Sequence, residues 1–316
     1  MNKSNRRDFL AARAGLVLAA AMILFAWSTP VAAAPSILQP YLKPQTLVVL
    51  PDGRRANFTC MGQGAPTAIL ESGWGVPDTS WRDIQPELAK ITRVCTFDRA
   101  GYGFSDPGPM PRDSAASVAD LHNALKAAGL AGPFVLVGHS LAGFDARLYA
   151  YSYPKEVAGL LLLDPPTENI YRRERQPDED LASIRTCIKI AKVRPIAPGD
   201  HCAPPPGPGW SDEEIGWMTR LSFFQTLLSE DESMVGRSAD ELAAARHGLG
   251  DLPLILLQAD ASPHDERSKE LDAMVRDSTR GAHRIVSGSR HFIYRDKPQA
   301  VIAAFGEIVA EARASR

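Results

Sequence analysis

The stretch Phe134-Val135-Leu136-Val137-Gly138-His139-Ser140-Leu141-Ala142-Gly143 decides how this chain folds. Its first four residues form a continuous apolar run, the pattern of a short β-strand that is covered on both faces. A helical pattern begins directly afterwards and continues to about Tyr151. Small residues around Ser140 allow the backbone to reverse sharply between these two elements. The sequence therefore predicts a strand that passes directly into a helix, with the Ser140 hydroxyl pushed out at the turn.

Strand and helix patterns alternate on both sides of this turn. Strands are expected at Thr46–Leu50, Ala56–Cys60, Thr67–Glu71, Arg93–Phe97, Phe134–Val137, Leu160–Asp164, Leu254–Leu257 and Arg284–Val286, and further helices at Ser80–Lys90, Ser114–Ala128, Glu266–Arg276 and Pro298–Ala312. Such alternation is typical of βαβ units and predicts an α/β fold with a mostly parallel sheet.

The alternation stops for about 85 residues, between Pro165 and about Asp251. Two Ser-x-x-Glu patterns, beginning at Ser211 and Ser238, indicate helix starts inside this stretch. An insertion between two strands of one sheet is expected to be a lid on that sheet. We therefore divide the chain into an export signal at 1–34, a core at 35–164 and 251–316, and a lid at 165–250. Four apolar residues of the lid either face a pocket or pack as helix core: Trp217, Met218, Phe223 and Phe224.

The first 34 residues have the pattern of an export signal. Basic residues precede an apolar stretch, Gly15–Trp27, which is shorter than the roughly 20 residues of a membrane span. The run Val31-Ala32-Ala33-Ala34 offers a cleavage site. The pair Arg6-Arg7, followed by Asp8-Phe9-Leu10, resembles a bacterial twin-arginine signal. We expect the export machinery to recognise this segment and the mature protein to be periplasmic or secreted, with no stable membrane span; an uncleaved anchor is the alternative.

Composition and charge exclude several classes of protein. The 316 residues are 45% hydrophobic and 23% charged, so the chain can bury a sizeable core and is not intrinsically disordered. The 35 Lys and Arg nearly balance the 37 Asp and Glu. This balance leaves no basic surface for nucleic acid, and no nucleic-acid partner is expected.

A serine hydroxyl is a weak nucleophile and needs a base within hydrogen-bonding reach. Among the seven histidines, His291 is the best candidate for that base, because it alone follows the last predicted strand in a Gly/Ser loop. His139 is adjacent to Ser140, and on a sharp turn we expect its side chain to point away from the nucleophile. The residues alone therefore predict nucleophilic catalysis by Ser140 with His291 as the general base.

Four motifs together resemble the α/β-hydrolase fold. Gly138-His139-Ser140-Leu141-Ala142 matches its Gly-x-Ser-x-Gly turn with alanine for the last glycine, and Ser72-Gly73-Trp74-Gly75 matches its His-Gly-x-Gly loop with serine for the histidine. Asp98-Arg99 begins the motif that ends at Ser105, in which we interpret Asp98 and Arg99 as a structural charge pair. Gly288-Ser289-Arg290-His291-Phe292 matches the histidine loop, although Arg290 is usually small there. The chain is similar to the esterase/lipase-like group of this family, whose lid follows the sixth strand.

The resemblance implies an eight-stranded sheet flanked by helices, a triad in the order serine–acid–histidine, and an oxyanion hole formed by the backbone N–H groups of Trp74 and Leu141. The acid has two candidates. Asp164 ends the sixth predicted strand, the alternative acid position of the fold, whereas Asp260 follows the seventh strand but lies two positions early. We favour Asp164 over Asp260, because the acid must reach the far nitrogen of the histidine ring.

The expected function is hydrolysis of an ester, or of a similarly activated acyl bond, in a small to medium apolar substrate. The reaction would proceed through an acyl-enzyme, without metal or cofactor. The serine at the turn excludes relatives with an aspartate nucleophile, namely dehalogenases and epoxide hydrolases. The alternatives are an acyltransferase, a carbon–carbon hydrolase or an aminopeptidase with the same triad, and a non-catalytic ligand sensor.

The four cysteines are Cys60, Cys95, Cys187 and Cys202, and none belongs to a C-x-x-C pair, so a zinc site is not expected. An exported protein meets an oxidising compartment in which disulfides form. We favour the pairs Cys187–Cys202, both within the lid, and Cys60–Cys95, because the second and fourth strands are neighbours in the resembled fold. Four buried free thiols are the alternative.

Overall fold

The computed structural model describes residues 37–169, 178–197, 199–204, 210–234, 236–260 and 265–315. The predicted export signal at 1–34 lies outside the described residues. None of the helices described combines the length and the hydropathy that crossing a membrane requires.

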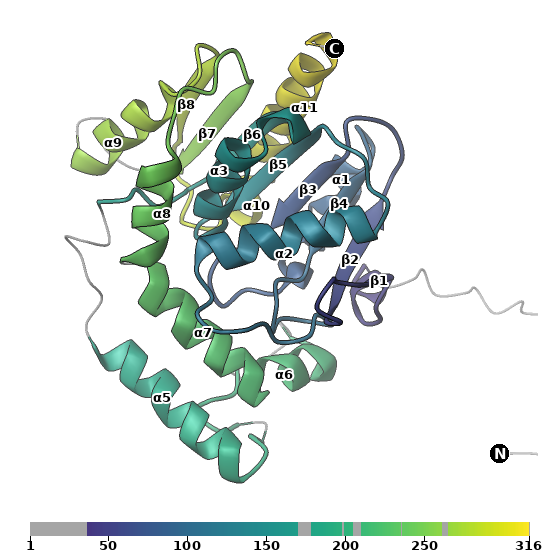
Figure 1. The fold of residues 1–316 in the computed structure, drawn as a ribbon, viewed down its shortest axis with the longest axis vertical. Helices are drawn as coiled ribbons and strands as arrows, with labels where there is room; N and C mark the ends of the chain where they lie inside the picture. The colour runs from purple at the N-terminus through teal and green to yellow at the C-terminus, as the bar shows by residue number, and fades with distance from the viewer. Residues whose placement is uncertain are drawn as a thin grey trace, which may run out of the picture. The chain divides into compact units, whose positions relative to one another are not determined.

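One eight-stranded sheet runs through the described core, in the order β1-β2-β4-β3-β5-β6-β7-β8. The strands are β1 (Thr46–Val49), β2 (Arg55–Met61), β3 (Ala68–Glu71), β4 (Val94–Phe97), β5 (Phe134–His139), β6 (Val157–Leu163), β7 (Leu254–Ala259) and β8 (Gly281–Val286). The pairs β1–β2 and β2–β4 are antiparallel, and the other five pairs are parallel. This arrangement confirms the predicted mostly parallel eight-stranded sheet (Figure 1).

Helices cover both faces of the sheet, which explains why β5 and β7 are buried along their whole length. The helices are α1 (Gln85–Leu88), α2 (Ser114–Ala127), α3 (Ala142–Ser152), α5 (Asp178–Val193), α6 (Asp212–Met218), α7 (Leu221–Met234), α8 (Arg237–Ala245), α9 (Glu266–Val275), α10 (Ile293–Asp296) and α11 (Pro298–Ala314), with short 3-10 turns η1 (Gln39–Tyr41), η2 (Asp78–Trp81) and η3 (Pro154–Glu156). Helices α2, α3, α8 and α9 contribute to the apolar cluster on one face, and α1, α10 and α11 to the cluster on the other.

The helix predicted at Ser80–Lys90 is two shorter turns. The chain forms η2 (Asp78–Trp81) and then α1, in which Pro86 occupies the first turn. Proline lacks an N–H and its ring clashes with the preceding helical turn, so a single helix cannot run through this position. The break places Trp81 in the core, stacked on Tyr294 with ring centroids 4.6 Å apart.

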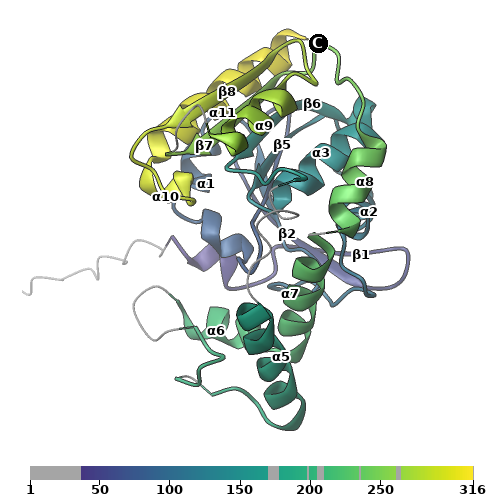
Figure 2. The same ribbon diagram turned by 90° about the vertical axis from the view of Figure 1, so that its left-hand side faces the viewer.

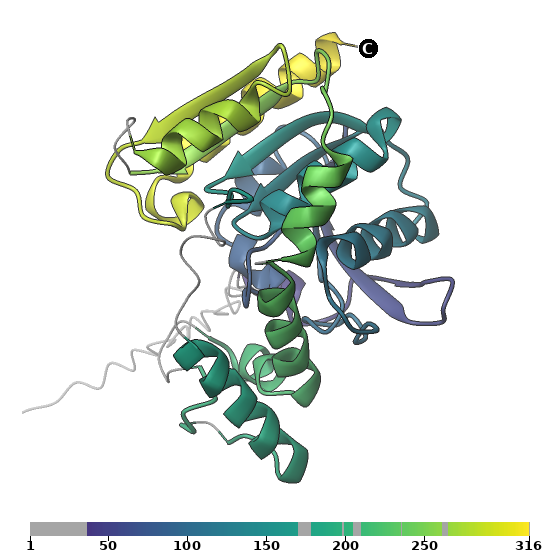
Figure 3. The same cartoon turned by 60° about the vertical axis from the view of Figure 1, so that its left-hand side comes forward.

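The insertion between β6 and β7 contains α5, α6, α7 and α8. Figure 2 shows α5 and α6 grouped around α7, away from the sheet. The predicted capping box is present at α6, where Ser211 and Glu214 each accept a hydrogen bond from the other's backbone N–H. Figure 3 shows α7 and α8 following each other toward the sheet. Because α7 lies between the outer helices and the core, it is the lid element best placed to reach the strand ends.

Helix α8 is bound to the core. It begins next to Ser238, as the Ser-x-x-Glu pattern predicts, but Ser238 and Glu241 do not cap it. The helix begins at Arg237, and no side chain caps its N-terminus. Instead, Ser238 Oγ accepts a hydrogen bond from Ser114 N at 3.0 Å, and Glu241 Oε2 accepts one from Ala115 N at 3.0 Å. The first N–H groups of any helix lack an acceptor within that helix. At the start of α2, two side chains of α8 supply the missing acceptors.

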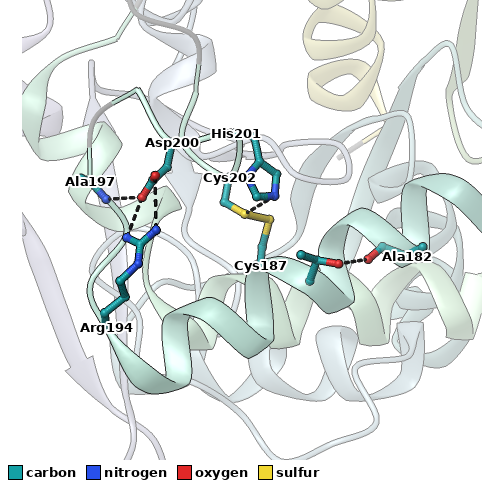
Figure 4. Close-up of a disulfide and its surroundings, with 8 residues drawn as sticks. Ala182, Cys187, Arg194, Ala197, Asp200, His201 and Cys202 are labelled. Atoms are coloured by element: carbon teal, nitrogen blue, oxygen red, sulfur yellow. Dashed lines mark hydrogen bonds and ion pairs between the residues drawn. A yellow bond between two sulfur atoms is a disulfide. The ribbon is translucent and has the colours of Figure 1, made fainter.

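Both predicted disulfides, Cys60–Cys95 and Cys187–Cys202, are present. Cys60 and Cys95 lie opposite each other in the β2–β4 ladder, with Cα atoms 4.0 Å apart. In Figure 4, Cys187 on α5 is joined to Cys202 on the loop that follows this helix, and His201 Nε2 lies 3.2 Å from Cys202 Sγ. Among the described residues, these three side chains lie close enough together to bind a metal ion. The two sulfurs are bonded to each other in the disulfide, so they are not thiolate ligands. Two disulfides fit an oxidising compartment.

Candidate active site

The predicted site residues follow four strands of the parallel part of the sheet, in which β3, β5 and β6 are neighbours and β7 separates β6 from β8. Ser140 follows β5, Asp164 follows β6, His291 comes five residues after β8, and the loop with Trp74 begins after β3. The carboxyl ends of parallel strands lie at one edge of a sheet, where ligands bind in open α/β folds. The topology therefore brings residues that are far apart in sequence to the same place.

Ser140 sits on a strained turn. Its φ is +53°, a left-handed conformation that residues with a side chain seldom adopt. A Cβ at Gly138 would lie 2.3 Å from the Ala142 carbonyl oxygen, and one at Gly143 would lie 2.5 Å from Pro165 Cβ. Only glycine fits at these two positions, whereas the alanine at 142 is accommodated in full burial. The departure from the Gly-x-Ser-x-Gly pattern thus leaves the turn intact.

The structure brings His291 and Asp164 into contact. His291 Nδ1 lies 2.6 Å from Asp164 Oδ2. A carboxylate can only accept, so Nδ1–H donates and Nε2 is left as the basic nitrogen of the neutral ring. The other candidate acid, Asp260, is exposed, and within the described residues it makes no contact with His291. His291 and Ser140 line the same cavity.

Asp164 is held as an anion by groups that sequence reasoning did not find. Its Oδ1 accepts hydrogen bonds from Ala259 N at 3.0 Å and from Arg267 Nη2 at 2.9 Å. Burial alone would raise the pKa of Asp164, but the hydrogen bond from His291, the charge of Arg267 and the Ala259 N–H together lower it to about 2. The carboxylate is therefore ionised throughout the neutral range. Arg267 lies on α9, and no local sequence pattern links it to Asp164.

The cavity beside Ser140 has a volume of about 320 Å³. Its lining is mostly apolar or aromatic and comes from the core and the lid: Gly73, Trp74, Val76, His139, Ser140, Leu181, Asp231, Met234, His291 and Phe292. The lid thus contributes Leu181 from α5, and Asp231 and Met234 from α7. The four lid residues considered from sequence, Trp217, Met218, Phe223 and Phe224, are buried and absent from this lining. Their role is packing.

The loop after β3 approaches Ser140 closely. A Cβ at Gly73 would lie 2.9 Å from Ser140 Cβ, so this position requires glycine. Ser72, which stands where relatives carry histidine, donates from its Oγ to the Pro77 carbonyl at 3.1 Å and thereby closes the loop. Within the described residues, the backbone N–H groups of Trp74 and Leu141 donate to no acceptor.

His139 is buried next to the site. It is among the residues that line the cavity, and its Nε2 lies 3.0 Å from the His291 carbonyl oxygen. A carbonyl can only accept, so Nε2 carries the proton. Burial, together with the nearby His291, lowers the pKa of His139 to about 3. His139 is thus a neutral side chain that supports the loop of His291.

Arg290, an unusual residue in the histidine loop, does not obstruct the site. Its side chain is 88% exposed and pairs with Asp296 at 2.9 Å. The Arg290 N–H also donates to Asp296 Oδ2 at 2.7 Å. This double contact fixes the loop on its solvent side.

Asp98 and Arg99 do not form the charge pair that the motif suggested. Asp98 Oδ2 accepts hydrogen bonds from Asn57 Nδ2 and from Phe104 N, and so closes its own loop. The Arg99 guanidinium points to the other side of the chain and pairs with Glu230 at 2.9 Å. Neighbouring residues in extended chain project in opposite directions, which separates these two side chains.

Glu71, the last residue of β3, is buried with two further carboxyl groups nearby, Asp145 and Glu230. Burial and the charge of Asp145 raise the pKa of Glu71 to about 8. The folded protein thus keeps this proton up to about pH 8, whereas an unfolded chain releases it above about 4.5. The contribution of Glu71 to stability is therefore present below pH 4.5 and is lost as the pH rises toward 8.

Replacing Glu71 with glutamine is expected to make the protein more stable than wild type at pH 8, by up to a few kcal/mol, with little difference at pH 4.5. Glutamine has the same shape and cannot ionise. Urea unfolding at several pH values measures the difference, with the exposed Glu213→Gln as control. A parallel pH dependence for Glu71→Gln and wild type would contradict this assignment.

Comparison with known proteins identifies the family. Residues 68–304 match the model of the alpha/beta hydrolase family. The chain belongs to this family. In Bacillus subtilis, the uncharacterized protein YbdG is 31% identical over 125 residues, which cover 39% of this α/β hydrolase and 38% of YbdG. Another uncharacterized protein of that organism, YqjL, is 30% identical, over 33% of this chain and 41% of YqjL. The chain thus matches about two fifths of the length of these curated relatives.

Solved structures of similar fold extend over most of the chain. A thermophilic esterase from Thermogutta terrifontis superposes with a TM-score of 0.60 and 22% identity, covering 84% of this α/β hydrolase and 98% of the esterase. A variant of a Pseudomonas aeruginosa protein, provisionally assigned as an epoxide hydrolase, gives a TM-score of 0.66 and 19% identity, covering 85% and 97% of the two chains. At these identities the likeness establishes the fold.

Proposed function

We propose that this α/β hydrolase is a serine esterase that cleaves an ester, or a similarly activated acyl bond, through an acyl-enzyme. The hydrogen bond of 2.6 Å between His291 and Asp164, beside a cavity that Ser140 also lines, carries the proposal. An ionised carboxylate on Nδ1 orients the imidazole and stabilises the imidazolium that forms when Nε2 accepts a proton.

The reaction begins when Ser140 Oγ attacks the acyl carbon while His291 Nε2 accepts the hydroxyl proton. The carbonyl oxygen becomes an oxyanion, which the N–H groups of Trp74 and Leu141 stabilise. His291 then returns the proton to the leaving alcohol as the acyl–oxygen bond breaks. Water, deprotonated by His291, releases the acid and restores Ser140.

The cavity indicates the kind of substrate. A volume of about 320 Å³ is at the small end of the range for ligand pockets. Trp74, Leu181 and Met234 give it a largely apolar wall. The proposed substrate is accordingly a small to medium apolar ester. We also propose that the segment 1–34 directs export to the periplasm or the medium by a twin-arginine signal, in keeping with the two disulfides.

A fluorophosphonate probe tests the proposed chemistry directly. The purified protein is expected to take up one probe per chain, on the peptide that contains Ser140, because an activated serine attacks the phosphorus and loses fluoride. Mass spectrometry of the digested protein locates the adduct, and heat-denatured protein serves as the control. Absence of an adduct on folded protein, or an adduct only at other residues, would refute the proposal and favour a non-catalytic binding protein.

A further inference from the structure

The peptide unit between Gly73 and Trp74 carries a proposed oxyanion donor, the Trp74 N–H. The carbonyl of the same peptide, Gly73 O, accepts a hydrogen bond from Arg99 Nη2 at 3.0 Å. In a trans peptide the C=O and N–H groups point in opposite directions within one rigid plane. A contact that fixes the carbonyl therefore also fixes the direction of the N–H.

Arg99 binds this loop with a charged, fully buried side chain. Its Nη1 donates to the Ser72 carbonyl, so the guanidinium holds two successive carbonyls of the loop. A charged donor on a carbonyl in a buried site makes a strong hydrogen bond and polarises the peptide, which makes the N–H of that peptide a better donor. Arg99 is 3% exposed and cannot exchange this contact for water.

Glu230, on lid helix α7, holds Arg99 in this orientation. Its Oε1 accepts from Arg99 Nε at 2.9 Å, and its Oε2 accepts from Tyr102 Oη at 2.7 Å. The same Tyr102 Oη accepts from Gly75 N at 3.1 Å. Glu230 is 3% exposed, so its carboxylate depends on these two partners. One lid carboxylate thus connects to both ends of the loop at 72–75, which we call the oxyanion loop.

A second contact joins α7 to the loop. Trp74 Nε1 donates to the Leu227 carbonyl at 2.9 Å, one helical turn before Glu230. The residue that supplies the proposed oxyanion donor is therefore attached to α7 by its side chain, while Arg99 orients its backbone.

We propose that Arg99 and Glu230 are positioning residues that build the oxyanion hole, and that the hole is complete only when lid helix α7 is docked. Neither side chain touches the substrate. They act through the Gly73–Trp74 peptide, whose N–H stabilises the charge that develops on the acyl oxygen. This inference rests on the proposed esterase function.

The central experiment compares Glu230→Gln with Glu214→Gln. Glu214 is an equally buried lid glutamate that pairs with a core arginine, Arg82, at 2.9 Å. Among the residues that the structure describes, its hydrogen bonds go to Arg82 and Ser211 and not to the loop at 72–75. Both variants lose the ion pair of a buried glutamate, so both are expected to have a lower melting temperature. Glu230→Gln is expected to lower kcat for p-nitrophenyl butyrate about 10- to 100-fold with little change in KM, whereas Glu214→Gln retains wild-type kcat.

A trifluoromethyl ketone provides a second readout. It forms a tetrahedral adduct with the serine, whose oxyanion occupies the hole, so its inhibition constant should rise in Glu230→Gln by the same factor by which kcat/KM falls. Tyr102→Phe, which removes only the hydroxyl, is expected to show a smaller change in the same direction and replaces Glu230→Gln if that variant does not fold.

Two results separate the failure of this inference from the failure of the esterase proposal. If folded Glu230→Gln and Tyr102→Phe keep wild-type kcat and inhibition constants, or if Glu214→Gln loses as much as Glu230→Gln, the positioning role is overturned while the esterase proposal stands. If the wild-type protein neither hydrolyses esters nor reacts with fluorophosphonate, the esterase proposal falls and this inference with it.

Discussion

Ser140→Ala is expected to lower kcat for p-nitrophenyl butyrate by about 10⁴-fold or more, without unfolding the protein. The variant lacks the attacking oxygen but keeps the cavity and the contact between His291 and Asp164. Alanine meets the same strain as serine in the left-handed backbone of this turn, so little change in stability is expected. Steady-state kinetics and thermal unfolding measure the two effects separately.

The matched control for this variant is Ser152→Ala. Ser152 is exposed at the end of α3, the helix that begins just after Ser140. Ser152→Ala should retain wild-type kcat and label with fluorophosphonate, whereas Ser140→Ala should do neither. A folded Ser140→Ala protein with substantial turnover would remove Ser140 from the reaction.

Asp164→Asn should reduce kcat about 10³- to 10⁴-fold. The asparagine amide has no charge to stabilise the imidazolium of His291, and it can hold the ring in the wrong tautomer. Because the pKa of Asp164 is about 2, the wild-type carboxylate is ionised at every pH above about 4. Titration of Asp164 itself therefore contributes nothing to the difference between the two proteins between pH 6 and pH 9. Activity–pH profiles of both proteins provide the comparison.

Asp260→Asn decides between the two candidate acids. Asp260 is exposed at the end of β7, and its backbone N–H donates to the Ser289 carbonyl, a contact that the asparagine keeps. We expect less than a threefold change in kcat for Asp260→Asn. The reverse result, with Asp260→Asn impaired and Asp164→Asn active, would transfer the acid role to Asp260 and require the loop after β7 to move toward His291.

The strands and the mostly parallel sheet could be predicted because local patterns specify them, whereas the pairing of the second strand with the fourth followed from the resemblance to the fold. Continuous apolar runs identified β5, β6 and β7, and each predicted strand agrees with the observed one to within a few residues. The single helix predicted at Ser80–Lys90 is wrong because Pro86 interrupts it. The prediction gave more weight to the apolar pattern than to this proline. Both disulfides could be anticipated, one from the strand order of the resembled fold and the other from the two cysteines inside a single insertion.

The same distinction between local patterns and long-range contacts applies to the residues of the candidate site. Ser140 and His291 lie in short motifs, and the choice of Asp164 required knowing which strand end faces the histidine. Arg267 and Glu230 belong to no motif, and Tyr102 occupies a variable position of one. Their roles arise from contacts between elements 100 residues or more apart in sequence. The Ser-x-x-Glu pattern at Ser238 was misread for the same reason. Its hydroxyl and carboxylate serve another helix, which a one-dimensional pattern does not reveal.

The way in which α8 caps α2 bears on how this enzyme scaffold can be re-engineered. Exchanging the whole insertion for that of a relative, in order to change the proposed substrate range, would remove two hydrogen-bond acceptors from the N-terminus of α2, a helix of the core. A chimera whose splice point lies ahead of Arg237 keeps Ser238 and Glu241 in place and leaves the core helix intact. Chimeras spliced ahead of Arg237 should fold and can then be tested for a new specificity. Chimeras in which α8 is also replaced should be poorly expressed.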